Sequence, residues 1–247
     1  MKKRTGILPL LIFTMFVYSC RKSSECDCVK GTGEMTKEVR TPVAFSEIWV
    51  WNEVNAVVRQ DTFFSVVVEG GENLVPFVTT EVVSNRLFIR NRNHCSWMRS
   101  YRKQKVTVFV SAPVIVKINN NGTGDIRGEG VITAPEFTLN VWSSGSINVF
   151  LNCGTSHCNL HTGVGDITMK GYSGVSYIYN AGSGFAYCGD LQSGYTFITS
   201  RGTGDSYVNV SKELDAGILW VGDVYYSGSP PVIKENISGK GRLFQSD

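Results

Sequence analysis

From residue 45 onward, apolar and polar residues alternate in short runs, which is the pattern of β-strands with one buried face. Runs of this kind cover residues 48–51, 55–60, 64–69, 86–90, 105–110 and 114–119. Most are separated by glycine, asparagine or proline, and Pro113 lies where a strand begins, the position that proline tolerates. Long stretches rich in Ala, Leu, Glu and Lys are missing, so the pattern predicts an all-β chain.

A glycine-rich signal recurs about every twenty residues between residues 120 and 225. Its last glycine lies at Gly124, Gly145, Gly165, Gly184, Gly204 and Gly222, in steps of 21, 20, 19, 20 and 18 residues. Aspartate follows four of these glycines, as Asp125, Asp166, Asp205 and Asp223. A fixed period of this length is typical of a solenoid, in which each repeat packs against its neighbours. We therefore predict a parallel β-helix (β-solenoid) with these residues at its corners, where φ is positive or backbones crowd.

Each repeat begins with an alternating strand, which assigns an inside and an outside to the coil. We expect its second and fourth residues to face the interior, namely Ile147, Val149, Ile167, Met169, Ala186, Cys188 and Val208. The outward Tyr187 and Tyr207, with other tyrosines nearby (Tyr177, Tyr179, Tyr225 and Tyr226), predict an aromatic strip. Such a strip either binds an extended polysaccharide or stabilises the sheet by stacking, and we favour stacking. Pro230 and Pro231, followed by residues 232–244, are expected to cap the solenoid.

The N-terminus has the features of an export signal. Residues 1–4 are basic, and the apolar run at 7–18 is too short to be a good membrane span. Val17-Tyr18-Ser19-Cys20 resembles the lipobox of bacterial lipoproteins. That resemblance implies a signal peptide at 1–19 and a lipidated Cys20. The following residues are polar and lack periodicity, so we expect a flexible tether at 20–40 before the β-helix domain at 41–247. The alternative is an ordinary secretory signal with a cysteine nearby.

Six further cysteines follow Cys20, and export would place them in an oxidising compartment where disulfides form. Cys153 and Cys158 bracket a Gly-Thr-Ser-His segment, which we interpret as a turn short enough for a local disulfide. Cys188 is expected to be a buried free thiol because it occupies an inward position. The three histidines are scattered and no C-x-x-C pair is present, so we predict neither a metal site nor a cofactor.

Several motifs, taken in order, resemble a known family. They are Phe45-Ser46-x-Ile48, the Val-Thr-Val-Phe-Val-Ser-Ala-Pro segment at 106–113, Gly-Thr-Gly-Asp-Ile at 122–126, Gly-Ser-Ile-Asn at 145–148 and Gly-Val-Gly-Asp-Ile at 163–167. Together they resemble the putative auto-transporter adhesin, head GIN domain family, over residues 40–230. The resemblance implies a right-handed parallel β-helix of the pectin-lyase type, found mainly in Bacteroidota, with no established catalytic residues. Ser146 and Phe185 replace the corner aspartate of that pattern.

The corner aspartates are the candidates for catalysis, because carbohydrate-cleaving β-helices use stacked carboxylates. On alternate coils they would lie roughly 9–10 Å apart from the strand spacing, at the edge of the separation of about 6.5–9.5 Å that suits an inverting glycosidase. No Lys or Arg accompanies them at the same repeat position. Aspartate after glycine is also a good turn residue that hydrogen-bonds its own turn. We therefore predict a turn role and no catalytic residue.

A basic, aromatic stretch is the better candidate for a binding site. Residues 86–117 contain eight Lys or Arg residues and no Asp or Glu. The residues predicted to bind a ligand are Arg90, Arg92, Trp97, Arg99, Tyr101 and Arg102. Arginine forms bidentate contacts with carboxylate, sulfate or phosphate, and aromatic rings stack on sugars or cations. The stretch thus predicts a site for anionic glycan or lipid headgroups; the alternative is a solvated hairpin loop.

These features predict an exported, non-catalytic binding protein. We expect an outer-membrane-anchored lipoprotein that faces the periplasm or the cell surface and adheres to an envelope or host glycan. Its membrane contact would be the N-terminal lipid, and the net charge of +3 is too small to indicate a nucleic-acid partner. The alternatives are a structural module that docks an envelope protein and a polysaccharide-cleaving β-helix enzyme.

Overall fold

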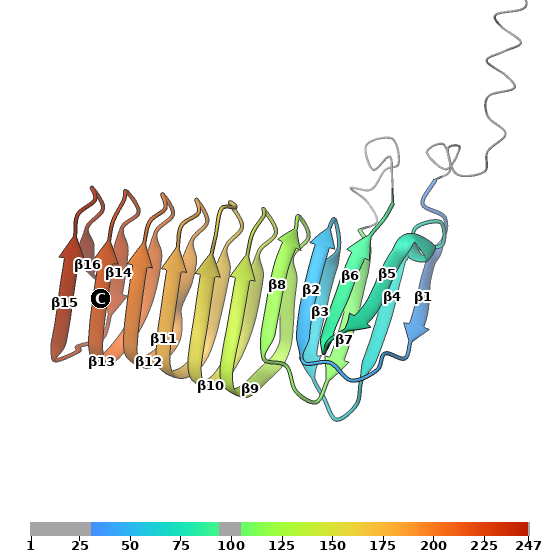
Figure 1. The fold of residues 1–247 in the computed structure, drawn as a ribbon, viewed down its shortest axis with the longest axis horizontal. Helices are drawn as coiled ribbons and strands as arrows, with labels where there is room; N and C mark the ends of the chain where they lie inside the picture. Colours follow the sequence, from blue (N-terminus) through green and yellow to red (C-terminus); the bar gives the residue numbers. More distant parts are fainter. Residues whose placement is uncertain (1–30, 94–104, 247) are drawn as a thin grey trace, which may run out of the picture.

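The computed structural model describes residues 31–93 and 105–246, which form a β-solenoid whose coils stack in a row (Figure 1). Its centre consists of five long parallel strands, which are β9 (Ile126–Val141), β10 (Ile147–Leu160), β11 (Ile167–Asn180), β12 (Ala186–Ser200) and β13 (Ser206–Ile218). Ile147 of β10 lies opposite Ile167 of β11. The structure thus confirms the predicted solenoid with its period of about twenty residues.

The earlier coils are built from shorter strands that are not in chain order. β2 (Glu47–Asn52) pairs in parallel with both β6 (Arg86–Asn91) and β8 (Lys117–Gly122). β3 (Asn55–Gln60) pairs in parallel with both β7 (Thr107–Ala112) and β9. The solenoid therefore extends well before the first glycine signal.

Antiparallel strands form the N-terminal end. β4 (Ser65–Gly71) pairs with β1 (Met35–Arg40) and β7, while β5 (Val78–Val83), which follows a short 3-10 helix at Val75–Phe77, pairs with β6. Arg40 joins β1 to β5, because its Nη1 donates to the Val78 carbonyl at 2.6 Å and to the Thr80 hydroxyl at 3.1 Å. The predicted tether at 20–40 is therefore wrong for residues 35–40. The side chains of β1 are mostly exposed, so the strand carries no hydrophobic alternation that would reveal it.

The interior holds one side chain from each coil at each inward position. All seven residues predicted to face inward are buried, from Ile147 to Val208. Tyr187 is 40% exposed, and Asn148 of the same outward column is also exposed, as the alternation requires.

The corner glycines are needed for close packing of the backbone. A Cβ placed on Gly145 would overlap the carbonyl oxygen of Gly124 on the previous coil, and one on Gly165 would overlap that of Gly145. None of the corner glycines has a positive φ. Of the two reasons given for glycine here, backbone crowding is confirmed and positive φ is wrong.

The C-terminal residues add a further coil where a cap was expected. β14 (Val224–Ser227) pairs with β13 and with β16 (Leu243–Gln245), and β15 (Val232–Ile237) pairs with β13. All six residues of β15 are exposed, and this strand lies at the end of the row in Figure 1. Within the described ranges there is no helix long and apolar enough to cross a membrane.

Candidate functional site

The corner aspartates link each coil to the next. In each case one carboxylate oxygen accepts a hydrogen bond from a backbone N–H of the following coil. The pairs are Asp125 with Ser146 (3.0 Å), Asp166 with Phe185 (2.8 Å), Asp205 with Asp223 (2.8 Å) and Asp223 with Arg242 (2.7 Å). We expected these carboxylates to bond their own turn, whereas they satisfy the backbone of the neighbouring coil.

Ser146 shows that the corner needs an acceptor and not specifically a carboxylate. Its hydroxyl oxygen accepts a hydrogen bond from the Asp166 backbone N–H at 3.0 Å. In the same way, the side-chain oxygen of Asn55 accepts from the Asp125 backbone N–H at 3.0 Å. Serine and asparagine thus replace aspartate in a series of such bonds along the solenoid, which only Phe185 interrupts among the described corners. The need for a hydrogen bond between coils therefore explains why polar side chains occupy these corner positions.

The predicted aromatic strip is present for Tyr187, Tyr207 and Tyr225, whose rings stack on one another, whereas Tyr226 is buried and Tyr179 lies beside His161. Successive centroids are separated by 5.6, 5.5, 4.9 and 5.2 Å, in the order Phe185, Tyr187, Tyr207, Tyr225 and Phe244. Tyr177 belongs to a second stack, between His157 and Phe197. Because sugars stack on ring faces and each inner ring has both faces covered by its neighbours, this strip is suited to stabilising the sheet.

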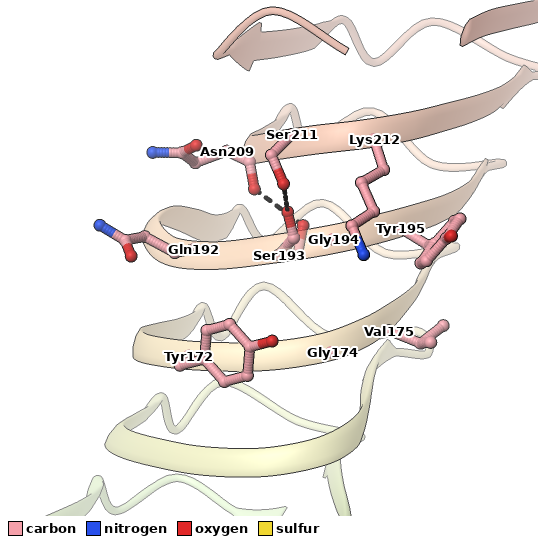
Figure 2. A pocket seen from close by; sticks show the side chains of 10 residues that line it. All are labelled: Tyr172, Gly174, Val175, Gln192, Ser193, Gly194, Tyr195, Asn209, Ser211 and Lys212. Atoms are coloured by element: carbon pink, nitrogen blue, oxygen red, sulfur yellow. Dashed lines mark hydrogen bonds between the residues drawn. The ribbon is translucent and has the colours of Figure 1, made fainter. Parts of the chain in front are cut away.

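A groove of about 400 Å³ crosses β11, β12 and β13 where these strands curve (Figure 2). Gly174 and Gly194 form its floor, and a Cβ on Gly194 would approach the Gly174 carbonyl oxygen at 2.9 Å. The remaining lining residues are Tyr172, Val175, Gln192, Ser193, Tyr195, Asn209, Ser211 and Lys212. Tyr172, Gln192 and Asn209 align on adjacent strands along one side, while Val175 and Tyr195 align along the other. The groove therefore runs along the solenoid axis.

The side chains of this groove are available to a ligand. Tyr172 is 53% exposed and Tyr195 is 38% exposed, and no aromatic ring of the described residues stacks on either. The amides of Gln192 and Asn209 project to the same side (Figure 2). Ser193 instead holds the strands together, since its hydroxyl donates to the Asn209 carbonyl at 2.7 Å. Exposed rings beside amides are suited to a ligand with both apolar faces and hydroxyl groups.

Sequence reasoning missed this groove, although a signal was present. Its glycines belong to a second series, Gly154, Gly174 and Gly194, spaced by twenty residues within the long strands. The four-residue segments 152–155, 172–175 and 192–195 share this glycine at their third position. The stronger glycine signal at the corners obscured this second series.

Four of the six residues predicted to bind a ligand in the basic stretch, Trp97, Arg99, Tyr101 and Arg102, lie outside the described residues. Arg90 is described, and its guanidinium carbon lies 5.2 Å from the Trp51 ring centroid and 4.7 Å from that of Phe88. Arg92 is exposed, and its backbone N–H donates to the Phe77 carbonyl at 2.8 Å. A ligand at this stretch stays a prediction.

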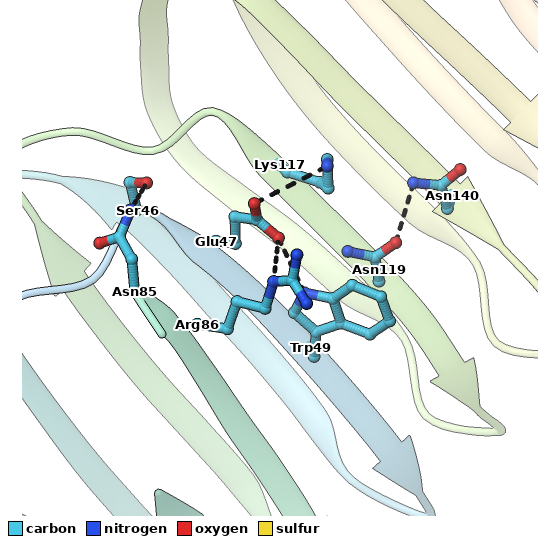
Figure 3. A network of polar contacts seen from close by, with 8 residues as sticks. All are labelled: Ser46, Glu47, Trp49, Asn85, Arg86, Lys117, Asn119 and Asn140. Atoms are coloured by element: carbon cyan, nitrogen blue, oxygen red, sulfur yellow. Dashed lines mark hydrogen bonds and ion pairs between the residues drawn. The ribbon is translucent and has the colours of Figure 1, made fainter. Parts of the chain in front are cut away.

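Glu47 and Glu81 neutralise part of the positive charge of this stretch, and Figure 3 shows the contacts of Glu47. Glu47 accepts from Arg86 Nε at 3.1 Å and from Trp49 Nε1 at 3.1 Å, and it lies 3.7 Å from Lys117 Nζ. Glu81 lies 3.6 Å from Arg90 Nη1. Arg86 and Arg90 are thus held over aromatic rings and beside carboxylates of the same chain.

The predicted disulfide between Cys153 and Cys158 is wrong. Both are buried free thiols, and they lie on the single strand β10, in which the Gly-Thr-Ser-His segment is extended and forms no turn. Burial raises the pKa of the Cys153 thiol, and the neighbouring Cys188 thiol, together with burial, raises that of Cys158. Cys188 is a buried free thiol, as predicted.

Cys20, at the predicted lipidation site, lies outside the described residues. Within the described ranges, no group of three or more His, Cys, Asp or Glu side chains could hold a metal ion.

Comparison with known proteins identifies several matches. A family model described as putative auto-transporter adhesin, head GIN domain, matches residues 44–230, whereas no curated protein sequence matches the chain. A putative adhesin from Bacteroides fragilis is similar in structure, with a TM-score of 0.79 and 22% identity over 88% of this chain and 100% of its own.

Two structures from Parabacteroides distasonis are also similar. A putative adhesin gives a TM-score of 0.66 and 21% identity over 87% of this chain and 98% of its own. A putative lipid binding protein gives a TM-score of 0.66 and 20% identity over 88% of this chain and 100% of its own. At these identities the similarity shows the fold alone.

Proposed function

The chain belongs to the putative auto-transporter adhesin, head GIN domain family, whose general role is adhesion or binding, and we propose that it binds an extended glycan in the groove across β11–β13. The observation that carries this proposal is the exposure of Tyr172 and Tyr195. Their ring faces are not covered by other aromatic rings of the described residues, unlike those inside the stack from Phe185 to Phe244. A sugar ring can therefore stack on Tyr172, or on the face of Tyr195 opposite the Lys212 ammonium group.

The shape and polarity of the groove support the same ligand class. Three adjacent parallel strands span roughly 10 Å, which is the length of a short oligosaccharide lying along the solenoid axis. The amides of Gln192 and Asn209 can both donate and accept hydrogen bonds with sugar hydroxyls. The glycine floor leaves room for the ligand between the two tyrosines.

Export and anchoring complete the proposal. The basic N-terminus, the apolar run at 7–18 and the lipobox-like sequence ending at Cys20 support cleavage before Cys20 and lipidation of its thiol. The lipid would hold the protein on the outer membrane, facing the periplasm or the cell surface. There the groove would contact envelope or host glycans.

The other classes of function find less support. Polysaccharide cleavage is not required to explain the corner aspartates, because one oxygen of each carboxylate accepts a hydrogen bond from a backbone N–H of the next coil. A lipid acyl chain favours an enclosed apolar cavity, whereas the groove presents amides, hydroxyls and the ammonium group of Lys212.

A glycan array tests the proposal. The chain carrying Cys20→Ala would be applied to the array, and Tyr172→Ala and Tyr195→Ala would each be compared with it. We expect each substitution to weaken binding by about tenfold, since a stacked ring contributes about 0.5–1.5 kcal/mol beyond its buried area. Tyr187→Ala, in the stacked strip, is the matched control and should leave binding intact.

Two results would contradict the proposal that the groove binds a glycan. One is the absence of binding to any glycan, which would favour a protein partner. The other is binding that depends on Trp97, Arg99 and Arg102 but not on Tyr172 and Tyr195, which would assign the ligand to the basic stretch.

A further inference from the structure

An irregularity in the strand pairing directs one charged side chain toward the groove. Ser193 pairs with Val210 and Tyr195 pairs with Glu213, so Gly194 of β12 lies opposite two residues of β13, Ser211 and Lys212. Two residues opposite one is the geometry of a β-bulge, and bulges commonly reorient a side chain beside a functional site. Gly194, the last glycine of the groove floor, is therefore the residue that lies opposite the bulge.

Lys212 extends back across the groove from the bulge (Figure 2). Its Nζ lies 5.4 Å from the centroid of the Tyr195 ring. Its Cδ lies 3.8 Å from the position that a Cβ on Gly194 would occupy. Packing on the tyrosine and the glycine thus orients the ammonium group at one end of the groove.

The ammonium group of Lys212 has no carboxylate within ion-pair distance among the described residues. Two lysines on neighbouring strands differ in this respect. Lys170 pairs with Asp190 at 2.9 Å, and Lys234 pairs with Glu213 at 2.6 Å. The acidic residues near the groove are therefore engaged elsewhere, and the charge of Lys212 is not neutralised by the protein.

We propose that Lys212 binds an anionic substituent, a carboxylate or a sulfate, on the glycan that occupies the groove. This inference rests on the proposed function and specifies its ligand class as acidic glycans. A neutral sugar covering Lys212 would remove water from the ammonium group without replacing its charge partner, which is unfavourable. An anionic substituent would supply a charge-assisted hydrogen bond, while the sugar ring stacks on an adjacent tyrosine.

Isothermal titration calorimetry with matched oligosaccharides tests this proposal. The probes are a galacturonate trimer, its methyl ester, and a galactose trimer with and without sulfate groups. We expect at least one anionic probe to bind about tenfold more tightly than its neutral match, because hydrogen bonds to charged groups contribute about 1.5–3 kcal/mol. The preferred probe identifies the substituent, and preference for either supports the proposal.

Substitutions of two lysines assign the effect to the groove. Lys212→Gln should abolish the preference for the anionic probe, because the anionic probe loses its charge partner and the neutral probe no longer covers an ammonium group. Lys212→Arg should retain the preference. Lys240→Gln is the control, because Lys240 lies outside the lining of the groove and its removal lowers the net charge equally. Unchanged thermal unfolding of Lys212→Gln would verify that the fold is intact.

The outcomes separate the two proposals. Neutral probes that bind as tightly as anionic ones, with binding that depends on Tyr172, would support glycan binding in the groove and contradict the proposed role of Lys212. A preference that persists in Lys212→Gln also overturns that role. If no probe binds, while none of the glycans on the array binds either, the proposed function itself fails.

Discussion

The carboxylate of Asp205 accepts a hydrogen bond from the backbone N–H of Asp223, one coil further along the solenoid, at 2.8 Å. Asp223 in turn accepts from the backbone N–H of Arg242 at 2.7 Å. A corner side chain thus accepts a hydrogen bond from a backbone about twenty residues away in sequence. These bonds connect successive coils at their corners. Phe185 has no side-chain acceptor, so it interrupts the series between Asp166 and Asp205.

Substitution at Asp166 should show how much one such bond contributes. Asp166→Ala removes the acceptor of the Phe185 backbone N–H, and we expect the free energy of unfolding to fall by about 1.5–3 kcal/mol, as for hydrogen bonds to a charged group. Asp166→Ser should recover much of this loss, because Ser146 already fills the same role. Urea denaturation measures both; equal losses in the two variants would contradict the need for an acceptor.

The aromatic stack should contribute to stability and not to ligand binding. Tyr207 lies between Tyr187 and Tyr225, with centroids at 5.5 and 4.9 Å. Tyr207→Leu breaks both contacts, and we expect a loss of about 1–3 kcal/mol, from about 0.5–1.5 kcal/mol for each aromatic pair. Tyr207→Phe keeps the ring and should be close to the wild type in thermal unfolding. A marked loss of glycan affinity in Tyr207→Leu, with its fold intact, would show that the strip binds the ligand.

His161 should make stability depend on pH. Its ring stacks on Trp142 with centroids 3.5 Å apart, and its Nε2 lies 3.0 Å from Asn140 Oδ1. Burial lowers the pKa of this imidazole below its ordinary value of 6.5, so the folded state favours the neutral ring. Its contribution is therefore present above about pH 6.5 and is lost as pH falls through the lowered pKa.

Thermal unfolding between pH 4 and pH 8 measures this contribution. The melting temperature of the wild type should fall more steeply below pH 6.5 than that of His161→Phe, which retains an aromatic ring without a titrating group. Parallel profiles for the two proteins would assign the acid sensitivity to other groups.

The stacked coils could be predicted from the sequence because the glycines from Gly124 to Gly222 recur with the same period as the coils. The sequence also predicted the inward residues, since each coil repeats the same alternation. Strand β1 was missed because both of its faces are mostly exposed and only its pairing with β4 reveals it. The disulfide was mispredicted because glycine was interpreted as a turn residue, whereas Gly154 lies within a continuous strand.

The groove is formed by residues of three coils, so it depends on the register between neighbouring strands. Tyr172, Gln192 and Asn209 become neighbours only through the register of three strands. The spacing from Gln192 to Asn209 is shortened by a register shift, and the bulge at Lys212 is a further departure from the period. Periodicity predicts the regular part of the solenoid, and these departures from it shape the candidate site.

β15, an edge strand at the C-terminal end, carries a charge that opposes association there. Ile233, Glu235 and Ile237 lie opposite the buried Leu214, Ala216 and Ile218 of β13, so they occupy inward positions. Another strand added to this edge would cover Glu235, and burying a carboxylate without a partner is costly. Inward charges of this kind protect exposed sheet edges.

Removing the charge of Glu235 should therefore allow two copies to associate through β15. In a symmetric antiparallel pair, residues that point to the same face lie opposite each other, so Glu235 of one copy can lie opposite Glu235 of another and repel it. We expect Glu235→Val to form dimers or larger species as its concentration rises, measured by light scattering after size-exclusion chromatography. Asn236→Val is the matched control, because it adds the same side chain at an outward position and keeps Glu235. If both variants remain monomeric, this carboxylate is not what protects the edge; if both associate, outward apolar surface alone is sufficient.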